Sequence, residues 1–267
     1  MDEKLTIIKL GGSVITNKNR PLTPNKDAIR KLARVISKIQ IPLIIIHGGG
    51  SFGHYWSVKY DMHTKPEKYN SKGISIVHSS MLELNRIVTE EFSKENTFPY
   101  SIPPFSFLSE GKPLKRKIKE LKTMTENKII PITYGDVVHV GANTYSIVSG
   151  DVLVTLLSNI LKPSKVIFTI NVDGLFNNLH DKKIISEINL SQFEQQKKSI
   201  ITNTVCGVGD VTGGMKRKMQ EALKIADKGT DVIFINGLRS GNLKNVLTQK
   251  SLKIRFLKVR NELLIHD

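Results

Sequence analysis

The sequence predicts an α/β fold, a three-layer αβα sandwich around a mainly parallel open sheet. Two observations support this prediction. Apolar runs of strand length alternate with amphipathic helical stretches along the chain, and several of the runs are apolar without interruption. Uninterrupted apolar strands are typical of parallel sheets that helices cover on both faces. Alternating strands and helices favour a single sheet joined by right-handed crossovers.

The expected elements follow in chain order. Strands are predicted at residues 5–10, 43–46, 129–133, 166–170 and 231–235, and helices at 25–39, 74–92, 152–161 and 215–226. Residues 137–151 alternate in polarity around a glycine, which indicates a hairpin inserted before the next helix. Residues 17–24 and 109–122 show the weakest patterns and are expected to be the loosest segments.

Composition restricts the class of protein. No repeat or linker divides the 267 residues, so we expect a single domain. One cysteine, Cys206, excludes an internal disulfide and fits a reducing cytoplasm. The first residues do not resemble a signal peptide, and no apolar run is long enough to span a membrane.

The chain is strongly basic, with 40 Lys and Arg against 24 Asp and Glu and a formal charge of +16. A nucleic-acid partner must therefore be considered. The lysines, however, are scattered and lack the interleaved aromatic residues of a single-strand platform. We expect solvated faces that also attract small anions, and no nucleic-acid partner.

Three glycine clusters stand at the ends of predicted strands or the starts of helices. They are Gly11–Gly12, Gly48–Gly50 and the run from Gly209 to Gly214. Glycine exposes backbone N–H groups, and a helix N-terminus adds a field that favours anions. The literal G-x-G-x-x-G match at Gly48 lacks the acidic strand end of a dinucleotide site, and no Walker motif occurs. Together the clusters predict a cradle for an extended polyphosphate.

Charged residues accompany these clusters. Lys9 lies within an apolar strand, where an ammonium group needs an anion nearby, and Lys18 follows in a polar loop. Lys218 lies early in the helix after the third cluster. Phosphoryl transfer depends on such positioned cations around migrating negative charge. Asp151 and Asp173 either orient these lysines or act as turn and helix caps.

The histidines have different expected roles. If the acceptor is a phosphomonoester, its second pKa is about 6 and it needs no general base. His54 is therefore predicted to donate hydrogen bonds to the acceptor phosphate and to relieve the repulsion between two anions. His47, at a strand end, is expected to be structural. His78, His139 and His180 show no ligand spacing, so no metal site is predicted.

Taken together, these motifs resemble the amino acid kinase superfamily. The resemblance rests on "KLGGSVITNK" from Lys9, "HGGGSFGH" from His47, "YGDVV" from Tyr134, "SGD" from Ser149, "NVDGL" from Asn171 and "DVTGGMKRK" from Asp210. The end of the second motif is similar to the branch of isopentenyl phosphate and fosfomycin kinases, and the closest likeness is to the isopentenyl phosphate kinases of the archaeal mevalonate route.

The resemblance implies ATP as donor, Mg²⁺, isopentenyl phosphate as acceptor and a homodimer. It implies an acceptor-binding lobe at about residues 1–162 and a nucleotide-binding lobe at about residues 163–267. The site residues that it implies are Lys9, Gly11, Gly12, Ser13, Gly50, Asp173, Gly214 and Lys218 for the nucleotide, Gly49, His54 and Gly150 for the acceptor phosphate, Lys18 for the transferring group, and Asp151 to organise the lysines. Relatives often carry aspartate where this chain has Asn171, and Lys216 and Arg217 are charges that the motif does not require.

Other functions remain open from the sequence. Another small-molecule kinase of the superfamily, for fosfomycin, a phosphonate or uridylate, would share most of these motifs. A non-catalytic nucleotide-binding regulator is disfavoured because Lys9, Lys18 and Lys218 are all present. A distinctive arginine for the α-carboxylate of glutamate or acetylglutamate is not evident. The apolar stripe of Ile74, Val77 and Met81 is by default core, although part of it could wall a site for an apolar tail.

Overall fold

A central sheet between two helical layers forms the described part of the chain. The computed structural model describes residues 4–173, 175–176, 184–185, 187–189, 214–248 and 257–260. The eight strands run in the order β12-β14-β13-β9-β1-β2-β6-β3. They are β1 (Thr6–Leu10), β2 (Leu43–His47), β3 (Pro99–Ser101), β6 (Ile130–Tyr134), β9 (Lys165–Ile170), β12 (Glu187–Asn189), β13 (Asp231–Asn236) and β14 (Leu257–Arg260). The pairing of β13 with β14 is antiparallel and the others are parallel, so the sheet is mainly parallel as predicted.

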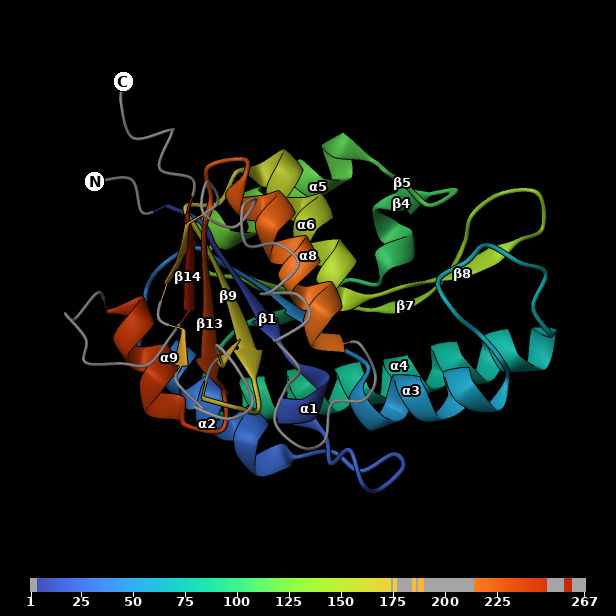
Figure 1. The fold of residues 1–267 in the computed structure, drawn as a ribbon, viewed down its shortest axis with the longest axis horizontal. Coiled ribbons are helices and arrows are strands. Elements are labelled where there is room, and N and C mark those ends of the chain that lie inside the picture. The colour runs from blue at the N-terminus through green and yellow to red at the C-terminus, as the bar shows by residue number, and fades with distance from the viewer. Residues whose placement is uncertain are drawn as a thin grey trace.

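Helices cover both faces of this sheet (Figure 1). One layer contains α5 (Lys115–Glu126), α6 (Gly150–Leu161) and α8 (Gly214–Ala226). The other contains α1 (Gly12–Ile15), α2 (Lys26–Ile36), α3 (Gly50–Lys59), α4 (Ser71–Ser93) and α9 (Ser240–Leu247). Each layer shares a separate apolar core with the sheet. The predicted three-layer αβα sandwich is therefore confirmed.

The central strands form where the sequence is continuously apolar. Every residue of β1 and of β2 is buried, including Lys9, which pairs in register with Ile46 on one side and Phe168 on the other. Apolar side chains on both faces of these strands pack against the two helical layers. Burying the ammonium group of a lysine in this position has a large desolvation cost, so Lys9 needs a partner of opposite charge.

Polar caps fix where several helices begin. The side chain of Asn25 accepts from Ala28 N at the start of α2, and Asn70 caps α4 in the same way. Ser149 accepts from Val152 N, so α6 begins at Gly150, two residues before the predicted start. A cap extends a helix beyond its apolar periodicity because it satisfies exposed N–H groups of the first turn.

The expectation of a loose segment at residues 109–122 was wrong. Here β4 (Leu108–Ser109) pairs with β5 (Lys112–Pro113), and α5 follows directly. Ile118, Leu121 and Thr125 form its buried stripe at helical spacing. The dense lysines around this stripe conceal the pattern, yet they occupy the solvent face of an amphipathic helix.

The predicted hairpin is present. Strand β7 (Asp136–His139) pairs antiparallel with β8 (Tyr145–Val148), outside the main sheet. Figure 1 shows it projecting on the side of α3 and α4. A small apolar cluster of Met62, Val77 and Val137 packs beneath it, with the aromatic rings of Trp56, Tyr60, Tyr69 and Tyr145 at its margin. The hairpin and the ends of α3 and α4 thus share a core of their own.

Ion pairs fasten α2 to α4. The Glu91 side chain is 1% exposed and lies 2.8 Å from Arg30 Nε and 2.7 Å from Lys94 Nζ. Burial by itself raises the pKa of Glu91, but the hydrogen bonds from Lys94 and Arg30 outweigh it and hold the pKa below its usual value. A group with a lowered pKa stabilises the fold above its unfolded pKa and stops doing so as the pH falls through its folded pKa.

We therefore expect Glu91→Gln to lower the free energy of unfolding at neutral pH by about 1–3 kcal/mol, the cost of losing charged hydrogen bonds in a buried position. The difference from the unmodified protein should shrink as the pH falls below about 4, where glutamate protonates. Urea unfolding between neutral and acid pH measures both effects. A constant difference across that range would contradict the assignment.

Candidate active site

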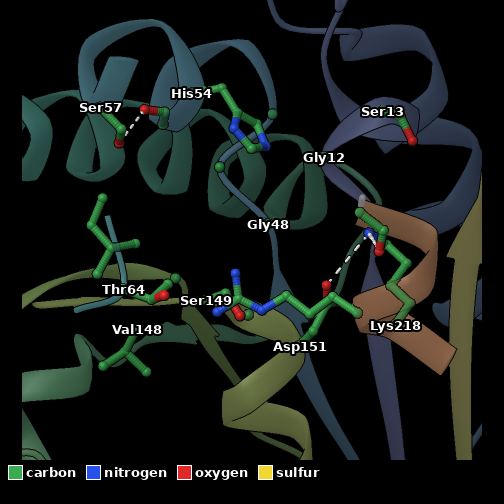
Figure 2. A pocket seen from close by; sticks show the side chains of 18 of the residues that line it. Gly12, Ser13, Gly48, His54, Ser57, Thr64, Val148, Ser149, Asp151 and Lys218 are labelled. Carbon is green, nitrogen blue, oxygen red and sulfur yellow. Dashed lines mark hydrogen bonds and ion pairs between the residues drawn. The ribbon is translucent and has the colours of Figure 1, made fainter. Parts of the chain in front are cut away.

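A cavity of about 360 Å³ lies at the carboxyl ends of the parallel strands. Its wall includes residues just beyond β1, β2, β6 and β9, for example Gly12, Gly48, Gly135 and Asn171. Open α/β sheets bind ligands at this edge. The cavity contains most of the residues that the sequence singled out, and it brings them together from distant parts of the chain (Figure 2).

Four helices begin at glycines in the wall of this cavity. The first residues of α1, α3, α6 and α8 are Gly12, Gly50, Gly150 and Gly214, and all four line the space. Helix N-termini carry unsatisfied N–H groups and a partial positive charge. Their convergence creates an anion site that is built from backbone. Residues 209–213 of the third glycine cluster lie outside the described residues.

Close packing explains why two of these positions are glycine. Gly50 has a φ of +49°, and a Cβ there would overlap the hydroxyl of Thr16. A Cβ on Gly12 would overlap the backbone of Gly50. The first two glycine clusters therefore touch, and only residues without side chains allow it.

A buried carboxylate holds two ammonium groups at the centre of the cavity. Lys9 Nζ lies 2.6 Å from Asp151 Oδ1, and Lys218 Nζ lies 3.4 Å from Asp151 Oδ2. Figure 2 shows Asp151 and Lys218 facing one another. Side-chain exposures of 3% for Lys9 and 8% for Asp151 place this pair out of bulk water. The partner that the buried lysine requires is therefore Asp151.

The pKa values of the pair follow from this burial. Burial lowers the pKa of Lys9, while the charge of Asp151 acts in the opposite direction. Burial alone raises the pKa of Asp151, but Lys9 and Lys218 outweigh it and lower the pKa below its usual value. Asp151 is accordingly ionised at neutral pH. One negative charge on two ammonium groups leaves the centre positive and ready for a further anion.

Further polar groups surround this centre. Lys18, which is exposed, lines the cavity from the loop after α1. Ser13 Oγ donates to Asn171 Oδ1 at 3.2 Å and links the first glycine loop to the end of β9. Arg217 also lines the cavity, and within the described residues no carboxylate forms an ion pair with it. The sequence marked Arg217 only as a charge without an assigned role.

Two of the predicted nucleotide residues lie outside the cavity wall. Gly11 is buried, and its N–H donates to Thr169 Oγ1 at 3.0 Å. Asp173 accepts from Asn236 Nδ2 at 2.9 Å and pairs with Arg239 at 2.9 Å. Both residues stand at the same edge of the sheet as the cavity. Their contacts connect strand ends to one another, and their role toward a nucleotide stays a prediction.

The two histidines of the second glycine motif occupy different environments. His54 is exposed on α3 and lines the cavity together with Gly49. His47 is fully buried; its Nδ1 lies 3.1 Å from the carbonyl oxygen of Gly48 and its Nε2 lies 3.3 Å from Asn85 Oδ1. Burial lowers the pKa of His47 to about 4, so its ring is neutral at neutral pH. The structural role predicted for His47 is confirmed.

Part of the cavity wall is apolar. Val77 and Met81 from α4, Ile147 and Val148 from β8, and Met62 line it, and we call this part the recess. Ile74, the first residue of the predicted stripe, packs instead into the small core beneath the hairpin. The stripe thus contributes to core and to cavity wall. Met62 lies in a polar stretch, and nothing in the sequence there indicates that it lines a site.

The comparisons with known proteins agree with this geometry. The amino acid kinase family model matches residues 4–236. The chain is 32% identical to an isopentenyl phosphate kinase of Methanocaldococcus jannaschii over 257 residues, covering 91% of this chain and 95% of that protein. It is 31% identical to an isopentenyl phosphate kinase of Thermoplasma acidophilum, covering 87% and 92% of the two chains. A crystal structure of the T. acidophilum kinase in a product complex matches with a TM-score of 0.76 at 25% identity, over 96% of this chain and 100% of that one.

Fold, cavity and sequence matches define a kinase of small molecules. The match over residues 4–236 covers most of the chain, and the glycine and lysine motifs fall inside it. The chain belongs to the amino acid kinase family.

Proposed function

We propose that this kinase transfers the terminal phosphoryl group of ATP to isopentenyl phosphate, giving isopentenyl diphosphate and ADP. One observation carries the proposal. The same cavity is lined by four helix N-termini, by a cationic centre and by an apolar recess. A phosphate with a short apolar tail matches both halves.

The chemistry needs positioning more than it needs a base. An oxygen of the acceptor phosphate attacks the γ-phosphorus of ATP, and the bond from that phosphorus to the β,γ-bridging oxygen breaks, with ADP as leaving group. Because the acceptor is already ionised at neutral pH, no proton has to be removed first. Bringing two anions into line is the main obstacle, and fixed cations and N–H groups reduce it.

We propose a place in this reaction for each predicted site residue, including the two that lie outside the cavity wall. We assign Lys9, Gly11, Gly12, Ser13, Gly50, Asp173, Gly214 and Lys218 to the nucleotide, and Gly49, His54 and Gly150 to the acceptor phosphate. Lys18 stabilises the phosphoryl group in transit, and Asp151 holds Lys9 and Lys218 in place. The contacts of Asp151 with both ammonium groups support its assignment as an organising residue.

ATP and Mg²⁺ are part of the proposal. The converging helix N-termini and the net positive centre fit a polyphosphate. Mg²⁺ is usually held by substrate phosphates together with one or two carboxylates, and it neutralises charge that develops on the transferred group. Within the described ranges, no group of three or more His, Cys, Asp or Glu side chains lies together as metal ligands. We propose that the ion arrives with the nucleotide.

We also propose a homodimer. Strand β3 is the last strand at its end of the sheet, and exposed apolar residues gather on and beside it. Phe98, Tyr100 and Phe105 are 66%, 55% and 72% exposed. An apolar edge strand favours pairing with another chain, and a second copy of the same edge is the simplest partner.

The remaining expectations concern the two lobes of the chain, its cellular compartment and its metabolic route. We propose that residues 1–162 form the acceptor-binding lobe and residues 163–267 the nucleotide-binding lobe. A chain with one cysteine fits a reducing compartment, which supports the cytoplasm. We place the reaction in isoprenoid biosynthesis by an archaeal-type mevalonate route. No helix among the described residues is long and apolar enough to cross a membrane.

The proposal is tested by a coupled assay of ADP release with a panel of acceptors. We expect isopentenyl phosphate and dimethylallyl phosphate to be phosphorylated with the highest kcat/KM, because they alone fill the recess and the phosphate site together. UMP, fosfomycin and acetylglutamate serve as competitors. A higher kcat/KM for any of these three would overturn the assignment of the acceptor and would favour another kinase of the same family.

A further inference from the structure

The "YGDVV" motif places a carboxylate, that of Asp136, in the wall of a cavity that we propose binds two anionic substrates. Asp136 lines the cavity, and its side chain is only 3% exposed. Burial raises the pKa of Asp136, while its hydrogen bond with His78 counteracts this. A bare carboxylate beside a phosphate ester would repel it. Asp136 is therefore either neutralised or turned away from the ligand.

Both oxygens of Asp136 are in fact occupied. Oδ2 lies 2.7 Å from Nδ1 of His78, and Oδ1 accepts from the N–H of Val137 at 2.8 Å. The hydrogen bond with Asp136 raises the pKa of His78. The acceptor sites of the carboxylate are thus occupied by protein groups.

His78 and Asp136 lie on elements that also supply, or pair with, the residues of the apolar recess. His78 lies on α4 between Val77 and Met81, the two α4 residues that wall the apolar recess. Asp136 is the first residue of β7, whose partner β8 supplies another part of that wall. The contact therefore connects α4, which supplies one part of the recess wall, to β7, the strand that pairs with β8.

The hairpin is also fixed at its base. Gly135 N donates to the carbonyl oxygen of His47 at 3.1 Å, and a Cβ on Gly135 would lie 2.8 Å from Gly150 N. The start of β7 is thus anchored to the phosphate side of the cavity. Beyond that anchor, Asp136 and His78 supply a polar connection between the hairpin and α4.

We propose that His78 and Asp136 form a strut that sets the width of the apolar recess and thereby the length of tail that the kinase accepts. The inference rests on the proposed function. His78 is a positioning residue: it acts through Asp136 and the hairpin, and its side chain is not in the cavity wall. With the strut intact, α4 and β8 stay at a spacing that suits a five-carbon tail; without it, the hairpin moves outward and longer tails enter.

The test compares His78→Ala with His78→Asn, using isopentenyl phosphate and geranyl phosphate as acceptors. His78→Asn keeps an amide donor near the place of Nδ1, whereas His78→Ala removes the donor. We expect His78→Ala to reduce the preference for the shorter acceptor about tenfold, as the loss of one charged hydrogen bond predicts. The KM for isopentenyl phosphate should rise, with kcat and the KM for ATP nearly unchanged. His78→Asn should restore most of the preference.

His139→Ala is the matched control, since it removes an imidazole from β7, the strand that His78 contacts through Asp136, and His139 lies outside the cavity wall. Melting curves establish that each variant is folded, which the 44% exposure of the His78 side chain favours. An unchanged preference in His78→Ala would overturn the strut, and so would an equal loss in His78→Asn. If the unmodified enzyme does not phosphorylate isopentenyl phosphate, the proposed function fails instead, so the two failures are distinguishable.

Discussion

Replacing His54 with alanine should abolish most acceptor binding while leaving nucleotide binding intact. His54 lies in the cavity wall on α3, beside the glycines that we assign to the acceptor phosphate. A hydrogen bond to an ionised phosphate contributes about 1.5–3 kcal/mol. We expect the KM for isopentenyl phosphate to rise between about tenfold and about 150-fold, with a lower kcat because the angle of attack is no longer fixed.

The measurement is steady-state kinetics for both substrates, together with calorimetric titration of ADP. Tyr55→Ala is a suitable control, because Tyr55 is the next residue of the same helix, is 39% exposed and does not line the cavity. Full activity of His54→Ala at low acceptor concentration would remove His54 from the site. A parallel loss of ADP affinity would show that its role is not confined to the acceptor.

Asp151→Asn should be the most damaging single change at the cationic centre. The amide keeps the shape of the carboxylate but removes the charge that Lys9 and Lys218 share. Breaking a buried ion pair on one side leaves the other charge uncompensated, at a cost of about 3–5 kcal/mol. We expect kcat/KM to fall by at least about a hundredfold.

Asp151→Asn should also shift the pH dependence of kcat/KM, in a direction that follows from the pKa of Lys9. Burial lowers the pKa of Lys9, and Asp151 is the group that raises it. Without Asp151 the pKa of Lys9 falls further, so Lys9 loses its proton at a lower pH than before. The alkaline limb of the kcat/KM profile should move to lower pH in Asp151→Asn. Asp27→Asn, on the surface of α2 with its partner Lys31, should leave the profile in place. An unshifted profile in Asp151→Asn would contradict the role of the pair.

Much of the cavity was predictable because its residues interrupt strong local patterns. Lys9 stands in a strand where every other residue is apolar or a buried threonine, and the glycines follow strand ends. Such interruptions are visible in one sequence. The partnership of Lys9 with Asp151 was not fixed in this way, since the sequence allowed Asp151 to be only a helix cap.

The residues that were missed act through tertiary placement. Arg217 carries no signal beyond its charge, and Met62 lies in a polar loop, yet both line the cavity. Asp173 was expected at the nucleotide; it lies outside the cavity wall, and its pairing with Arg239 depends on how β13 ends. The same reason explains why α5 was not predicted: its apolar stripe can be recognised as buried only once the sheet that covers it is known.

The separate small core beneath the hairpin has a consequence for how this family diversifies. The residues that we assign to phosphate come from both helical layers and from several strands, and those layers share the main cores with the sheet. Of the residues around the recess, Met62, Val77 and Ile147 belong to this small core, whereas Met81 and Val148 pack with the main cores. On the proposed function, substitutions in the small core would change the choice of acceptor and would leave the residues that we assign to phosphoryl transfer in place.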